Sequence, residues 1–100
     1  MRIEIRSVGF TTTEALRAHV LRRLGSALAR RADRIRRVIV RMSDENGPRG
    51  GLDKSCRIEA VLAGHPTRVS EGLAADLYTA IDAAARRLGR LLDRGQRPYL

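Results

Sequence analysis

The residues of this sequence that could do chemistry are arginines spaced for two helices. Four of them lie in the run "LYTAIDAAARRLGRLLDR" of residues 77–94: Arg86, Arg87, Arg90 and Arg94. Three more lie in residues 11–31: Arg22, Arg23 and Arg30. At about 100° per residue, each set falls together on one side of its helix. Planar guanidinium groups bind phosphate through paired hydrogen bonds, so these arginines predict a surface that binds a polyanion.

Other reactive side chains do not form a pattern that indicates catalysis or metal binding. His19 falls on the basic side of its helix, and neither it, His65 nor Cys56 has a spacing that resembles a zinc site. The glycines of residues 47–51 lack the Lys-Ser/Thr that a phosphate-binding loop needs. Serine, histidine and aspartate all occur, yet nothing in their order suggests that they converge. We therefore expect no enzyme, no metal site and no cofactor.

Hydrophobic periodicity indicates the elements that carry the arginines. Apolar and polar residues alternate, as in half-buried strands, in four segments: 2–6, 33–43, 54–63 and 67–71. Helical apolar stripes occur in residues 11–31 and 77–94. The stripe of the second helix comprises five residues: Leu77, Ile81, Ala84, Leu88 and Leu91.

Turn and cap residues suggest where these elements end. Thr11 and Glu14 have the spacing of a capping box at the start of the first helix. Gly25 weakens that helix, so we expect it to mark a close contact. Gly72 leads into the second helix, and residues 44–53 form a turn-rich loop.

The resulting order β-α-β-β-β-α predicts an α+β fold. We expect a two-layer sandwich, in which a four-stranded sheet has both helices packed on one face. Each helix turns its apolar stripe to the sheet, so the two basic sides look outward next to each other. Cys56 occupies an inward strand position. Residues 1–94 form a single domain, and 95–100 a short C-terminal tail.

The net charge of +9 is concentrated where the helices lie. Residues 1–43 carry 11 Arg and 3 acids (+8), residues 44–76 carry 4 basic and 6 acidic residues (−2), and residues 77–100 carry 5 Arg and 2 acids (+3). Such a domain typically binds nucleic acid, less often an anionic membrane. The use of 19 Arg against 1 Lys also fits a solvated surface of compositional origin. With no membrane-length apolar run and no signal peptide, a cytoplasmic location is expected.

Aromatic residues are too few to form a base-stacking platform. The chain has three: Phe10, Tyr78 and Tyr99. Single-strand binders that stack bases on a sheet need several exposed aromatics on adjacent strands. We expect Tyr78 to pack over the sheet edge, and recognition to depend on phosphates and RNA shape.

Residues 76–92, "DLYTAIDAAARRLGRLL", resemble the final helix of the ribosome hibernation-promoting factor family, also called ribosome-associated inhibitor A or sigma-54 modulation proteins. "MRIEIR", "TTTEALRAHVLRRL" and "RIRRVIVRMS" are similar to their counterparts in order and spacing, so the resemblance covers almost the whole chain. It implies a non-enzymatic translation inhibitor of the short form. Such a protein binds small-subunit rRNA in the channel used by mRNA and tRNA, here through the seven helix arginines.

The expected partners are therefore the small ribosomal subunit and its rRNA, with the chain a monomer away from the ribosome. No membrane and no small-molecule substrate is expected. One alternative is a general binder of structured RNA without preference for the ribosome. Another is an adaptor on a membrane surface or an acidic protein, although the apolar stripes are needed to cover the sheet.

Overall fold

The computed structural model describes residues 1–44 and 52–95 of the chain and has the predicted order of elements. Its elements are β1 (Arg2–Val8), α1 (Glu14–Leu28), the short 3₁₀ helix η1 (Ala32–Arg34), β2 (Ile35–Asp44), β3 (Lys54–Leu62), β4 (Arg68–Ala74) and α2 (Leu77–Gly95). Most of the expected loop at 44–53, and residues 96–100 of the expected tail, lie outside the described residues.

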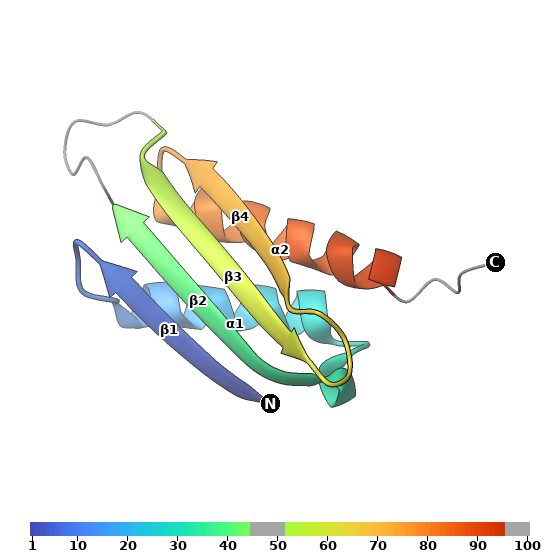
Figure 1. Cartoon of the computed structure of the whole chain (residues 1–100). Helices are drawn as coiled ribbons and strands as arrows, with labels where there is room; N and C mark the ends of the chain where they lie inside the picture. Colours follow the sequence, from blue (N-terminus) through green and yellow to red (C-terminus); the bar gives the residue numbers. More distant parts are fainter. Residues whose placement is uncertain (45–51, 96–100) are drawn as a thin grey trace.

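The four strands form one sheet in the order β1-β2-β3-β4. The pair β1–β2 is parallel, whereas β2–β3 and β3–β4 are antiparallel. Helix α1 is the crossover between the two parallel strands, and α2 returns to the same face (Figure 1). The predicted α+β two-layer fold is therefore confirmed, and none of the described elements covers the other face of the sheet.

The hydrophobic core lies between the sheet and the helices. Its large buried residues come from both layers: Leu16, Val20, Leu24, Leu28, Val38, Val40, Met42, Ile58, Ile81 and Leu88. Cys56 is fully buried among them, as predicted, and burial raises the pKa of its thiol to about 12. The apolar stripe of α2 ends at the buried Leu92 and not at Leu91, which is only half-buried.

Side-chain caps begin both helices. Thr13 is the N-cap of α1, since its Oγ1 accepts a hydrogen bond from the Leu16 backbone N–H at 3.1 Å. The expected cap at Thr11 is thus wrong, because α1 begins only at Glu14. Residues before Thr13 still contact the sheet, since the Thr12 hydroxyl contacts Ser7 of β1. In α2, Asp76 Oδ1 accepts from the Thr79 N–H at 2.8 Å.

Two glycines have roles that differ from those expected: Gly72 was expected to lead into α2, and Gly25 to mark a close contact. Gly72 lies within β4, where an added Cβ would clash with the Ala80 carbonyl oxygen and lie 2.8 Å from the Ala84 nitrogen of α2. Glycine therefore lets β4 and α2 approach closely, and the buried Ser70 hydroxyl donates to the Ala84 carbonyl at 2.8 Å beside it. Gly25 has nothing within 4 Å of such a Cβ, so the expected close contact there is wrong.

Candidate polyanion-binding groove

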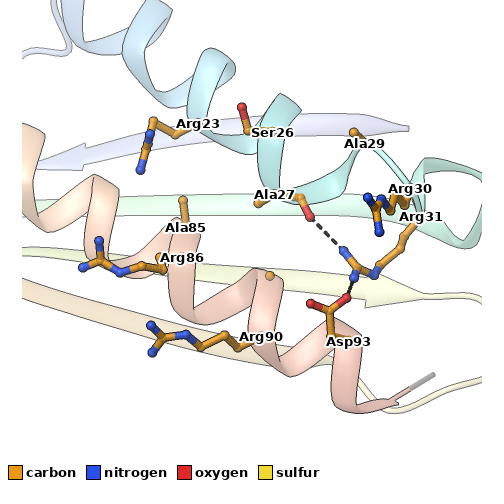
Figure 2. Close-up of a pocket in the computed structure, with 11 residues that line it drawn as sticks. Arg23, Ser26, Ala27, Ala29, Arg30, Arg31, Ala85, Arg86, Arg90 and Asp93 are labelled. Carbon is orange, nitrogen blue, oxygen red and sulfur yellow. Dashed lines mark hydrogen bonds and ion pairs between the residues drawn. The ribbon is translucent and has the colours of Figure 1, made fainter. Parts of the chain in front are cut away.

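An open groove with a volume of about 460 Å³ runs between α1 and α2 on the outer side of the helix layer (Figure 2). It exists because small residues face each other where the helices meet. A Cβ added to Gly89 of α2 would lie 3.9 Å from the Ala27 Cβ of α1, an ordinary packing distance, and Ala85 is buried next to them. Small side chains form the floor, and long ones stand at the rims.

Arginine dominates these rims. Among the lining residues there are five arginines against one aspartate: Arg23, Arg30, Arg31, Arg86, Arg90 and Asp93. Figure 2 shows Arg86 and Arg90 extending from α2, with Arg23 and Arg30 on the α1 side of the same hollow. The groove is therefore strongly cationic.

Both acidic residues of α2 are used in ion pairs with α1 and the turn that follows it. Asp82 Oδ1 lies 3.1 Å from Arg23 Nε and 2.6 Å from His19 Nε2. Asp93 pairs with Arg31, whose Nη1 also donates to the Ala27 carbonyl at 3.1 Å. These contacts hold the helices together at both ends of the groove and leave no acid of α2 to neutralise the other arginines.

Three groove arginines remain without an acidic partner. Within the described part of the chain, Arg30, Arg86 and Arg90 are solvent-exposed and form no ion pair. Guanidinium groups that are not bound to a carboxylate can bind phosphate oxygens in a bidentate manner without losing an existing interaction. The groove can thus hold a chain of phosphates.

The structure brings together four of the seven arginines predicted from the sequence, namely those that line the groove. Arg87 points away from it and donates to the Glu71 carbonyl of β4. Together with Arg94 it lines a second hollow of about 310 Å³ beside β4, which Arg90 also reaches. Arg22 is exposed and lines neither hollow; its Nη2 lies 3.5 Å from His19 Nδ1.

Sequence reasoning missed Arg31, which is 7% exposed. This residue follows the last turn of α1, so helical periodicity cannot assign it to a face. The signal that could have identified it is Asp93, an acid at the edge of the basic side of α2 that needs a basic partner. His19 is also placed differently from expectation, because it is turned toward Asp82 and not toward solvent. Tyr78 packs edge-on against its ring at 5.0 Å between centroids, and not over the sheet edge.

Two other kinds of feature were sought in the described residues. Across residues 1–44 and 52–95, no cluster of three or more His, Cys, Asp or Glu is placed to hold a metal ion. The helices in this part of the chain are too short or too polar to cross a membrane.

Comparison with known proteins agrees with this architecture. Residues 3–97 match the family described as sigma 54 modulation protein / S30EA ribosomal protein. The fold is similar to that of a ribosomal subunit interface protein from Coxiella burnetii, with a TM-score of 0.80 and 20% identity over 96% of this chain and 98% of that one. It is also similar to the N-terminal domain of Protein Y from Thermus thermophilus, with a TM-score of 0.79 and 28% identity over 96% of this chain and 100% of the other. No curated protein sequence matches the chain.

Proposed function

Since the chain belongs to the sigma 54 modulation protein / S30EA ribosomal protein family, we propose that it is a ribosome-associated translation inhibitor whose helix groove binds small-subunit rRNA. The description of the family and the ribosomal subunit interface protein of the same fold support association with the ribosome. A ribosomal partner would place the chain in the cytoplasm, where it would be a monomer when not bound.

The observation that carries this proposal is the uncompensated charge of the groove. Arg30, Arg86 and Arg90 face one hollow with no carboxylate bound to them in the described residues. Phosphate is the ligand that such a set of guanidinium groups fits best. The backbone of folded RNA supplies phosphates in series, with no requirement for a particular base sequence.

Inhibition follows from occupancy alone. The channel used by mRNA and tRNA is a cleft walled by rRNA phosphates, and a cleft of one charge sign concentrates the electric field within it. A cationic domain is drawn into such a cleft faster than onto an open surface. Once bound there, it excludes mRNA and tRNA sterically, with no reaction and no cofactor.

The experiment that tests the proposal is competition on purified small subunits. We expect the protein to co-sediment with them, to inhibit translation in vitro in proportion to its ratio to ribosomes, and to protect rRNA around the decoding region. Mixing subunits first with mRNA and initiator tRNA should slow its binding. Equal binding to initiating ribosomes, without displacement of either ligand, would contradict the channel proposal.

A second candidate function is general binding of structured RNA. It is favoured by the absence of any aromatic stacking site in the groove lining, which leaves phosphate and shape as the recognised features. Sedimentation of a cell lysate separates the two candidates. The proposed function predicts migration with small subunits, whereas a general binder would spread over all RNA fractions.

A further inference from the structure

The uncovered face of the sheet carries a second concentration of arginine. Figure 1 shows the strands in front of both helices, so this face lies opposite the groove. The strand registers place Arg6 opposite Arg41 and Arg41 opposite Arg57, which makes one row across β1, β2 and β3. A second row is formed by Arg2 and Arg37.

Such rows are unfavourable unless an anion binds them. Neighbouring strands lie only about 4.8 Å apart, so the three side chains of the first row stand within roughly 10 Å of one another. Like charges directly opposite on adjacent strands destabilise a sheet. Arg41 is the middle member and has an arginine on each side.

Glutamates offset only the outer members of the rows. Glu4 pairs with Arg2 at 3.6 Å and with Arg6 at 2.9 Å. Arg57 pairs with Glu59 at 3.3 Å and with Glu71 of β4 at 2.7 Å. None of these pairs includes Arg37 or Arg41 of β2, which lies between β1 and β3.

Two of the three arginines of β2, Arg37 and Arg41, stand in these rows, and both remain free in the described part of the chain. Both Arg37 and Arg41 are exposed and form no ion pair within the described residues. Between them, Ile39 is only 7% exposed although it points away from the helices. The low exposure of Ile39 fits the way in which the aliphatic stems of arginine side chains cover apolar surface while their charged ends stay in solvent.

Two acids of this face, Glu4 and Glu59, lie lower than the arginines, whereas Glu71 of the edge strand β4 is 64% exposed. The side chains of Glu4 and Glu59 are 22% and 24% exposed, against 54% for Arg6 and 46% for Arg57. A molecule that approaches the sheet over β1 and β2, away from Glu71, therefore meets guanidinium groups first.

We propose that this open face, defined by Arg2, Arg6, Arg37, Arg41 and Arg57, is a second polyanion-binding surface that takes the phosphate backbone of another RNA segment. This inference rests on the proposed function, since it takes RNA as the occupant of the groove. The two surfaces lie on opposite faces of a two-layer domain, so one straight duplex cannot contact both. The domain therefore bridges two RNA segments, as a wedge between two walls of a cleft.

Energy transfer between two RNA duplexes of mixed sequence, one with a donor dye and one with an acceptor, tests the bridging directly. The wild-type chain should bring the duplexes together at low salt. The variant Arg37→Gln/Arg41→Gln should still bind one duplex through the groove, but its bridging signal should fall to background. The control Arg17→Gln/Arg34→Gln removes the same charge from positions that belong to neither a strand nor the groove, and it should bridge as the wild type does.

The sheet variant also has a signature in stability. Because it removes like-charged neighbours, its melting temperature should equal or exceed that of the wild type. Loss of bridging together with a lower melting temperature would overturn the inference, since the arginines would then serve the fold.

The remaining outcomes separate this inference from the proposed function. Bridging by the sheet variant at the wild-type level, with a groove variant (Arg86→Gln/Arg90→Gln) that no longer binds RNA, would overturn the inference and leave the proposed function standing. A wild-type chain that binds neither duplex nor small subunits would remove both. A sheet variant that bridges RNA normally but loses binding of a glutamate-rich peptide would assign this face to a protein partner and overturn the RNA assignment.

Discussion

At the residue scale, the two aspartates of α2 decide which arginines are available to phosphate. Asp82 holds Arg23 and His19, and Asp93 holds Arg31. The arginines that have no such partner, Arg86 and Arg90 among them, are those we assign to RNA. Arg23 lines the groove and is bound to Asp82, so RNA phosphate and this aspartate compete for its guanidinium group.

This competition predicts the effect of Asp82→Asn. The change releases Arg23 into the groove, so RNA affinity should rise at low salt, while loss of a half-exposed ion pair should cost about 1 kcal/mol of stability or less. Anisotropy of a labelled RNA and a thermal melt measure the two effects. Asp33→Asn in η1 is the control, because it alters the net charge equally; an equal gain in affinity from both variants would mean that total charge alone matters.

At the scale of the elements, one glycine in helix α1 and one in strand β4 should respond in opposite ways to an added methyl group. Gly25→Ala should stabilise α1 by about 0.5–1 kcal/mol, because an exposed helix position with open space around it gains from alanine.

Gly72→Ala should destabilise the fold by about 1–3 kcal/mol, because its methyl group would collide with the backbone of α2. Denaturant melts of both variants measure these changes. Stabilisation by Gly72→Ala would contradict the close packing of β4 against α2.

The cap of α2 predicts a pH dependence. Hydrogen bonds from the Thr79 N–H and hydroxyl to the Asp76 carboxylate lower the pKa of Asp76 below its ordinary 3.8. A lowered folded-state pKa gives stability that is complete above the unfolded value and is lost as pH falls through the folded one. Asp76→Ala should therefore melt below the wild type at pH 7, and the gap should begin to close as pH falls past about 4. A gap that does not change between pH 7 and pH 2 would show that the ionised carboxylate is not what caps the helix.

The elements themselves were largely predictable, because alternation and helical stripes report burial directly. The inward positions of β2 and the core position of Cys56 follow from period two alone. Contacts between elements were not predictable in this way. The capping box pattern pointed to Thr11 although Thr13 is the cap, and only the helix pairing shows that Asp93 holds Arg31.

At the scale of the whole molecule, the basic charge is divided between two faces. The helix layer presents the groove, and the open sheet presents the rows around Arg41, with the core between them. Sequence periodicity could place the helix arginines on outward faces, yet it could not show that four of the seven share a groove while Arg87 is bound to β4. A domain with cationic surfaces on both sides suits a cleft with two phosphate walls better than a single duplex.

The most direct test of the central claim is the affinity for small ribosomal subunits, measured between 50 and 200 mM salt for Arg86→Gln/Arg90→Gln and for the control Arg17→Gln/Arg34→Gln. If the groove binds rRNA phosphates, the groove variant should lose affinity by about tenfold or more at low salt, since each lost contact is a hydrogen bond to a charged group. Its plot of log affinity against log salt should also be less steep than that of the wild type by about 2, or about 1 per phosphate contact. The control should keep an affinity and slope close to those of the wild type. A groove variant that matches the control in both quantities would contradict the account.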